Sequence, residues 1–98
     1  MDTQVYMRRE SVVRRDVAGE TFLVPIHGHL ADLQELFVLN EVGDWVWGRL
    51  DGARNLDDLA EGLSTDFEVT KEQALNDTRS FVERLVEAGL AEGSSGRE

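Results

Sequence analysis

The chain has no cysteine among its 98 residues. Disulfides, zinc–thiolate sites and thiol nucleophiles are therefore excluded. Apolar runs are short as well, and none approaches the roughly 20 residues that a membrane-spanning helix needs. The arginines near the N-terminus are not followed by the apolar stretch of a signal peptide. These absences favour a cytoplasmic protein.

Basic residues are scarce. Ten lysines and arginines stand against 20 aspartates and glutamates, which gives a net charge of −10. The distribution is uneven, because residues 1–15 carry four arginines against two acidic side chains and the remainder is strongly negative. A negative field repels phosphate backbones and favours basic partners. It also keeps a small protein soluble, which is the simpler explanation.

The length predicts one domain with a single modest core. Residues 1–10 are expected to form a loosely held, flexible arm. Two strands are predicted over 11–17 and 21–26, with a hairpin turn between them at 18–20. Pro25 near the end of the second strand favours a sheet edge or a strand terminus there.

A third strand is predicted over 33–39, where the last four residues are all apolar. A strand with apolar side chains on both faces needs cover on both faces. Because side chains alternate along a strand, Phe37 and Leu39 share one face, and Leu36 and Val38 share the other. The sequence leaves open which pair faces the core.

A helix is expected directly after this strand. Asn40 can cap its first turn, and apolar residues recur at helical spacing up to Leu50, before Gly52 supplies a stop signal. Trp45 and Trp47 fall about 200° apart on such a helix. One of the two is therefore expected in the core, and the other in a packing or partner contact.

Two further helices follow in the sequence. Asn55 can cap the first of them, which is predicted over 56–63. The second begins at Thr70, which opens a capping box, and stops at Gly89. After this glycine we expect one short extended pairing and then a flexible tail over 92–98.

The apolar arc of the last helix is wide, at about 140°. A wide arc fits a generously apolar core helix, and it also fits a helix that serves the core and forms one wall of a groove. The residues of the arc are Ala74, Leu75, Thr78, Phe81, Val82, Leu85 and Val86. Strands followed by a compact set of helices predict an α+β, winged-helix-like fold.

Other candidate sites are weaker. His27 and His29 offer two imidazoles without a clear third ligand, which favours a loop pair over a metal site. Acidic residues of the second helix lack the spacing and the glycine of a calcium loop. An acidic pair such as Asp51 with Asp57 has no pocket or nucleophile to make it catalytic. No metal, cofactor or catalytic residue is predicted.

Several short motifs follow one another at a spacing that resembles the PqqD-like family, also called RiPP precursor peptide recognition elements. The match runs from about residue 12 to 91, and it depends on the order of the motifs rather than on any one of them. The motifs are Leu39-Asn40, Trp47, Leu50-Asp51-Gly52, Leu56-Asp57-Asp58-Leu59-Ala60, Phe67-Glu68-Val69, Asp77, Leu85 and Gly89-Leu90. The resemblance assigns 11–91 to one peptide-recognition domain.

The resemblance implies a three-stranded antiparallel sheet followed by three helices. It also implies a function, which is to bind the leader segment of a ribosomally synthesised, post-translationally modified precursor peptide and to present that peptide to a modifying enzyme, often a radical SAM protein. The leader adds as a fourth strand beside the third strand and against the third helix. The implied peptide-binding residues are Leu33, Glu35, Leu36, Phe37, Val38, Leu39, Thr78, Phe81, Val82 and Leu85.

Two function classes compete. The first is a non-catalytic peptide chaperone, with a precursor peptide and a modifying enzyme as partners and with no nucleic-acid or membrane partner. The second is a winged-helix nucleic-acid-binding regulator. Residues 55–69 contain five acidic residues and no lysine or arginine, so a recognition helix there would repel phosphates. A small enzyme, the third class, lacks a catalytic constellation. We therefore expect the peptide chaperone.

Overall fold

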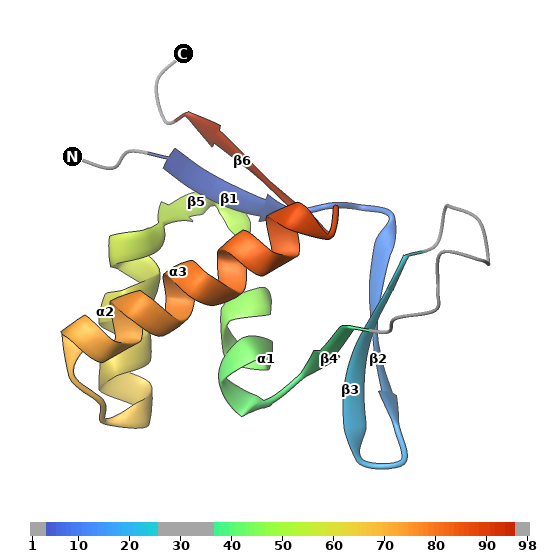
Figure 1. The fold of residues 1–98 in the computed structure, drawn as a ribbon, viewed down its shortest axis with the longest axis horizontal. Coiled ribbons are helices and arrows are strands. Elements are labelled where there is room, and N and C mark those ends of the chain that lie inside the picture. Colours follow the sequence, from blue (N-terminus) through green and yellow to red (C-terminus); the bar gives the residue numbers. More distant parts are fainter. Residues whose placement is uncertain (1–3, 26–36, 96–98) are drawn as a thin grey trace.

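The computed structural model describes residues 4–25 and 37–95. Its strands form two three-stranded antiparallel sheets, with strand orders β2-β3-β4 and β5-β1-β6. Figure 1 shows the first sheet beside the helices and the second above them. The elements in chain order are β1 (Gln4–Arg8), β2 (Val12–Val17), β3 (Glu20–Pro25), β4 (Phe37–Leu39), α1 (Glu41–Trp47), β5 (Asp51–Asn55), α2 (Leu56–Phe67), α3 (Lys71–Glu87) and β6 (Ala91–Ser95).

The predicted α+β fold, with a three-stranded antiparallel sheet and three helices, is confirmed. Its first hairpin turns at Ala18 and Gly19, whose φ angles of 53° and 86° are both left-handed. A two-residue turn with positive φ at both positions matches the twist of the strands that it joins. The turn is therefore one residue shorter than predicted, and Glu20 already pairs with Val17.

The third strand of this sheet is β4, which pairs with β3 in the register Thr21↔Leu39 and Leu23↔Phe37. The predicted strand over 33–39 is confirmed for its last three residues. The remainder of that prediction lies outside the described residues, as do His27 and His29.

The second sheet was not predicted, and it corrects the expectation of a loosely held arm over 1–10. Strand β1 pairs along its whole length with β6, from Gln4↔Ser95 to Arg8↔Ala91, and it also pairs with β5. The expected flexible tail over 92–98 is corrected in the same way as far as Ser95. Neither β1 nor β6 has a clear apolar alternation by which its sequence could predict a strand. Backbone hydrogen bonds between distant segments hold these strands instead.

Strand β1 also ends helix α1. The Arg8 guanidinium donates hydrogen bonds to the carbonyl oxygens of Trp47, at 3.1 Å, and of Gly48, at 3.0 Å. The Trp47 carbonyl also accepts from the Leu50 amide at 3.2 Å, and a cation at a helix C-terminus complements the helix dipole. The expected arm is therefore part of what stabilises the first helix.

Helix α1 begins where the sequence predicts it. The Asn40 side chain accepts a hydrogen bond from the Gly43 amide at 2.7 Å. The predicted stop at Gly52 is wrong, because the helix is capped at Gly48. Gly52 lies in β5 with φ of 85°, where that strand makes a bulge against β1. Leu50 is buried beyond the helix rather than in it.

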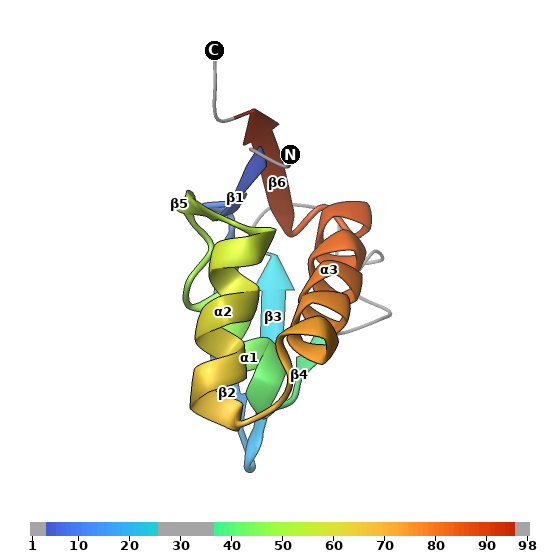
Figure 2. The same ribbon diagram turned by 90° about the vertical axis from the view of Figure 1, so that its left-hand side faces the viewer.

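The N-caps of α2 and α3 are confirmed at Asn55 and Thr70, but the full capping box lies at Asn55, and at the predicted position the structure shows only its Thr70 half. The Asn55 side chain and Asp58 form a reciprocal capping box at the start of α2. This helix runs to Phe67, four residues beyond its predicted end. The Thr70 hydroxyl accepts a hydrogen bond from the Gln73 amide at 3.1 Å, which starts α3. In Figure 2, α2 and α3 lie side by side, with α1 and β3 seen between them.

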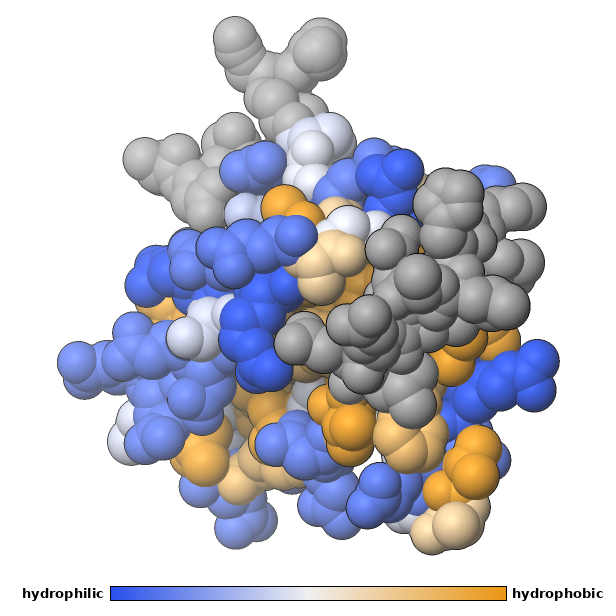
Figure 3. Space-filling view, turned by 45° about the vertical axis from the view of Figure 1, so that its right-hand side comes forward, coloured by the Kyte–Doolittle hydropathy of each residue, from blue (hydrophilic) through white to orange (hydrophobic). Residues whose placement is uncertain are grey.

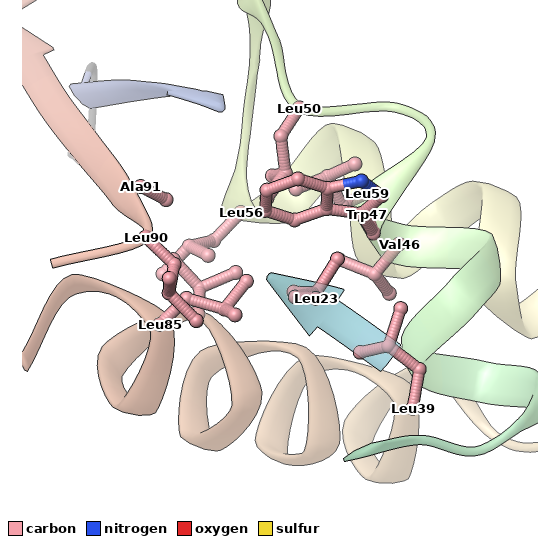
Figure 4. Packing of buried hydrophobic residues seen from close by; sticks show 11 residues of the cluster. Leu23, Leu39, Val46, Trp47, Leu50, Leu56, Leu59, Leu85, Leu90 and Ala91 are labelled. Carbon is pink, nitrogen blue, oxygen red and sulfur yellow. The ribbon is translucent and has the colours of Figure 1, made fainter. Parts of the chain in front are cut away.

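The core joins the β2-β3-β4 sheet to the helices. Figure 4 shows Leu23 of β3 and Leu39 of β4 turned toward Val46 and Trp47 of α1, with Leu85 of α3 nearby. Each fully buried side chain of this size stabilises the fold by about 1.5–3 kcal/mol. None of the helices in 4–25 and 37–95 has both the length and the apolar character needed to cross a membrane.

The two tryptophans separate as predicted. Trp47 is buried in the core, whereas Trp45 packs on the side of α2. The indole N–H of Trp45 donates to Asp66 at 2.7 Å, and the Arg49 guanidinium lies 3.9 Å from its ring centroid. A Cβ atom built on Gly62 would stand 2.9 Å from the Trp45 ring, so α1 and α2 approach closely only because residue 62 is glycine.

We predict that Gly62→Ala destabilises the protein. Alanine raises helix propensity by about 1 kcal/mol, but overpacking against the Trp45 ring costs about 1–3 kcal/mol. Gly48→Ala is the matched control, since Gly48 has φ of −65° and its Cβ would lie no closer than 3.7 Å to the nearest atom. Urea unfolding measures both variants, and a Gly62→Ala protein as stable as the control would contradict this packing.

A bidentate ion pair ties β2 to α1. Arg14 Nε lies 2.6 Å from Asp44 Oδ1, and Arg14 Nη2 lies 2.8 Å from Asp44 Oδ2. These hydrogen bonds lower the pKa of Asp44 below its ordinary value. A lowered pKa in the folded state adds stability above the unfolded pKa of about 4, and that stability is lost as pH falls through the folded value.

Replacing Arg14 with glutamine is expected to return the pKa of Asp44 toward its ordinary range. The pair is partly exposed and screened by solvent, so the loss of stability at neutral pH should be small. Carboxyl carbon NMR over a pH titration measures the pKa directly. Arg54→Gln is the control, because Arg54 pairs with Asp51 instead. An Asp44 pKa that is unchanged in Arg14→Gln would contradict the assignment.

Candidate functional site

Strand β4 lies at the edge of its sheet. It has β3 on one side, and no other described strand pairs with it. An edge strand presents unpaired N–H and C=O groups that can pair with another chain. The edge of β4 is therefore the first candidate for a binding surface.

The hairpin register shows which backbone groups face this edge. In a two-residue hairpin, the residues that flank the turn, here Val17 and Glu20, exchange both ladder hydrogen bonds. Bonded and non-bonded pairs then alternate along β2 and β3. Thr21 and Leu23 consequently turn their backbone groups away from β2 and toward β4.

The same alternation continues into β4. Phe37 and Leu39 stand opposite Leu23 and Thr21, so their N–H and C=O groups point back to β3. Val38 lies between them, and its N–H and C=O therefore point outward from the sheet. This residue offers both a donor and an acceptor at the free edge.

Side chains of β4 divide as the period of two requires. Leu39 is buried, Phe37 is half-buried, and Val38 is 51% exposed. Of the two arrangements left open by the sequence, the structure has Phe37 and Leu39 toward the core and Val38 away from it.

Helix α3 faces β4 through an aromatic contact. The rings of Phe37 and Phe81 meet edge to face, with centroids 6.0 Å apart and planes at 65°. The Arg84 guanidinium lies 5.1 Å from the Phe37 ring centroid. A Cβ on Gly43 would stand 3.1 Å from the Phe81 ring, so the first turn of α1 fixes that ring from below.

Three of the predicted α3 residues lie deeper than a groove wall. Thr78, Val82 and Leu85 are each at most 1% exposed, and they hold the helix against the core. The Thr78 hydroxyl has no hydrogen-bond partner among the described residues. Phe81 alone of the four is half-buried, so it is the predicted α3 residue that reaches both the core and the surface.

A hollow of about 320 Å³ opens beside this contact, between the start of α1 and the outer edge of α3. Most of its lining was missed by the apolar arc because the residues are polar or lie on α1. The sequence could have indicated the four lining residues on α3 by their spacing, because they lie at i, i+3, i+4 and i+7 from Asp77 and so share one side of the helix. The lining residues are Asn40, Val42, Gly43, Asp77, Ser80, Phe81 and Arg84.

A second hollow, of about 420 Å³, lies on the other side of β4. Val38 and Leu39 line it together with residues of the β2-β3 turn and of α1. Figure 3 shows apolar surface in patches over the lower half of the face on which these elements come forward. One hollow is thus lined by β4 itself, and the other lies next to it between α1 and α3.

Leu33, Glu35 and Leu36, the remaining predicted site residues, lie outside the described residues. No group of three or more histidine, aspartate or glutamate side chains that could hold a metal occurs in the described part of the chain. Two of the acidic residues considered for calcium have structural partners, because Asp58 caps α2 and Asp66 accepts from Trp45.

The hydrogen bonds of Asp51 are also structural. Its carboxylate accepts from the Ala53 amide at 3.0 Å and pairs with Arg54. The amide hydrogen bond is the main reason that the pKa of Asp51 is lowered. Such a group stays ionised at the start of β5, and among the described residues its carboxylate bonds to an amide and a guanidinium rather than to a second carboxylate.

Comparisons with known proteins give the same fold. The structure resembles two solved structures, "Lasso peptide synthetase B1 complexed with the leader peptide" at a TM-score of 0.70 and 22% identity, and "TbiB1 in Complex with the TbiA(beta) Leader Peptide" at a TM-score of 0.68 and 20% identity. The first alignment covers 89% of this chain and 96% of the other, and the second covers 88% and 94%. No curated protein matches the sequence.

The family model described as "Coenzyme PQQ synthesis protein D (PqqD)" matches residues 20–91. This range contains β3, β4, β5, all three helices and the first residue of β6. It therefore includes the strand edge, the aromatic contact and both hollows apart from Gly19. The chain belongs to the PqqD family.

Proposed function

We propose that this protein is a non-catalytic peptide chaperone. It binds the leader segment of a ribosomally synthesised precursor peptide by strand addition to β4, and it presents that precursor to a modifying enzyme. The observation that carries the proposal is the free edge of β4, where Val38 turns its N–H and C=O outward beside the Phe37–Phe81 contact.

Strand addition suits this edge chemically. Main-chain hydrogen bonds to the edge supply affinity for any extended peptide, and side-chain pockets beside it supply selectivity. Phe81 and Val42 are half-buried at the hollow next to α3, so they offer apolar surface to alternate side chains of the added strand. A leader held in this way keeps the rest of the precursor free for an enzyme.

The similar structures support the proposal. Both are complexes of proteins of this fold with a leader peptide, by their own descriptions. A micromolar affinity, about −8 kcal/mol, would suffice for a chaperone that must also release its cargo.

The charges of α2 weigh against the nucleic-acid alternative. Asp57, Asp58 and Glu61 are exposed on that helix, and the segment 55–69 has no lysine or arginine. A recognition helix must neutralise phosphates, so this one has the wrong sign. Three of the four arginines near the N-terminus already have partners, because Arg8 caps α1, Arg9 pairs with Glu92 and Arg14 pairs with Asp44.

A modifying enzyme, such as a radical SAM protein, remains the predicted second partner. The two similar structures point to a broader class, because one carries the description of a lasso peptide synthetase component. The shared requirement is an enzyme that acts on a peptide. A cytoplasmic location also remains a prediction from the sequence.

We predict that Val38→Pro weakens leader binding about two- to twelvefold. Proline removes the one outward N–H of β4, and a single backbone hydrogen bond is worth about 0.5–1.5 kcal/mol. The β3–β4 ladder does not use this N–H, so the fold should survive. Calorimetric titration can use synthetic leaders from precursor-like reading frames that neighbour the gene.

Val38→Thr is the matched control, because it keeps the N–H and a β-branched side chain. It should bind like the unaltered protein. Amide chemical-shift mapping should place the perturbed residues at 37–39 and 78–86. Perturbation confined to α2, or leader binding weaker than about millimolar for every candidate, would sink the strand-addition proposal.

We also predict that Phe81→Ala reduces leader affinity more than it reduces stability. Truncation of a fully buried phenylalanine to alanine costs about 3–5 kcal/mol of stability. Phe81 is only half-buried, so its truncation should cost less. Leu75→Ala is the control, because Leu75 is a half-buried residue of α3 that packs between the two core clusters. It should lose stability with its affinity unchanged. Equal affinity losses in both variants would indicate a general effect of unfolding.

A further inference from the structure

Two opposite charges lie on the edge of α3 that faces the hollow between α3 and the start of α1, which we call the groove. Asp77 and Arg84 both line the hollow beside β4, together with Ser80 and Phe81. Their spacing of seven residues places them on one side of the helix, two turns apart, or about 10 Å along its axis. The groove therefore has a negative end and a positive end.

Neither charge is committed within the described part of the chain. The described ion pairs involve other residues, and the Arg84 guanidinium contacts the Phe37 ring alone. Both side chains are exposed. Each is thus available to a ligand that enters the groove.

The polarity follows the direction of β4. Arg84 lies over Phe37, the first residue of the strand, whereas Asp77 shares the hollow with Asn40, which follows the last one. Helix α3 and strand β4 consequently run in opposite directions along the groove. A strand added at the edge of β4 would pass Asp77 at one end and Arg84 at the other.

We propose that these two residues select the charge pattern of the bound peptide. The peptide carries a cationic side chain at the Asp77 end and an anionic side chain at the Arg84 end. Strand residues on one face recur about every 6.6 Å, so the two peptide charges stand two or four positions apart. In a peptide antiparallel to β4, the cation precedes the anion. This inference rests on the proposed strand addition at β4.

A charge exchange tests the proposal. The double variant D77K/R84E reverses the polarity of the groove and leaves the net charge unchanged. A displayed library of random linear 12-residue peptides is selected on the unaltered protein and on the double variant. We expect opposite charges at the stated spacing in the first selection and the reversed order in the second.

Affinity measurements on the selected peptides give the size of the effect. An exposed ion pair is worth at most about fivefold, so the loss of both pairs in the double variant should lower the affinity by up to about 25-fold. High salt should reduce the difference, because exposed charges are screened. The control R79E/E83K reverses two exposed charges on the opposite side of α3 and should bind like the unaltered protein.

The outcomes separate this inference from the proposed function. In one outcome, the selected peptides fail to bind Val38→Pro but show no charge pattern, or show the same pattern on D77K/R84E. This outcome overturns the charge selection and leaves strand addition intact. Peptides that bind Val38→Pro as well as the unaltered protein, or a library that yields no binder, overturn strand addition and the charge selection together.

Discussion

The hydrogen bond from the Gly43 amide to the Asn40 side chain is the contact on which the site depends. It ends β4 and begins α1 within one residue, so the strand edge and the helix have a fixed relation. It also places Gly43 directly under the Phe81 ring, where a larger residue would force the ring to move. Phe81 contacts Phe37 of β4, and it forms the apolar wall of the hollow between α3 and the start of α1.

The sequence predicted what local chemistry determines. Asn40, Asn55 and Thr70 cap helices because each cap needs only the three residues that follow it. The β1–β6 pairing was missed because it joins segments some 85 residues apart, and backbone groups rather than apolar side chains hold it. Gly52 was misjudged for the same reason, since its left-handed backbone serves a bulge against β1 rather than a helix end.

The candidate site was predicted in part. An apolar arc identifies residues that avoid water, so it selected Thr78, Val82 and Leu85, which the core takes up. Whether a residue lines a groove depends on its position in the fold rather than on its hydropathy. Arg84 could therefore be assigned to the site only from the structure, in which its guanidinium lies over the Phe37 ring. The edge character of β4 likewise depends on sheet order, which no single strand encodes.

Strands β1 and β6 pair at Gln4↔Ser95, so the two ends of the described chain leave the domain side by side. They do so at the end of the molecule away from β4 (Figure 1). Domains with adjacent termini tolerate insertion into other proteins and circular permutation. This domain could therefore be placed within a surface loop of a larger enzyme, with the edge of β4 still open to a peptide.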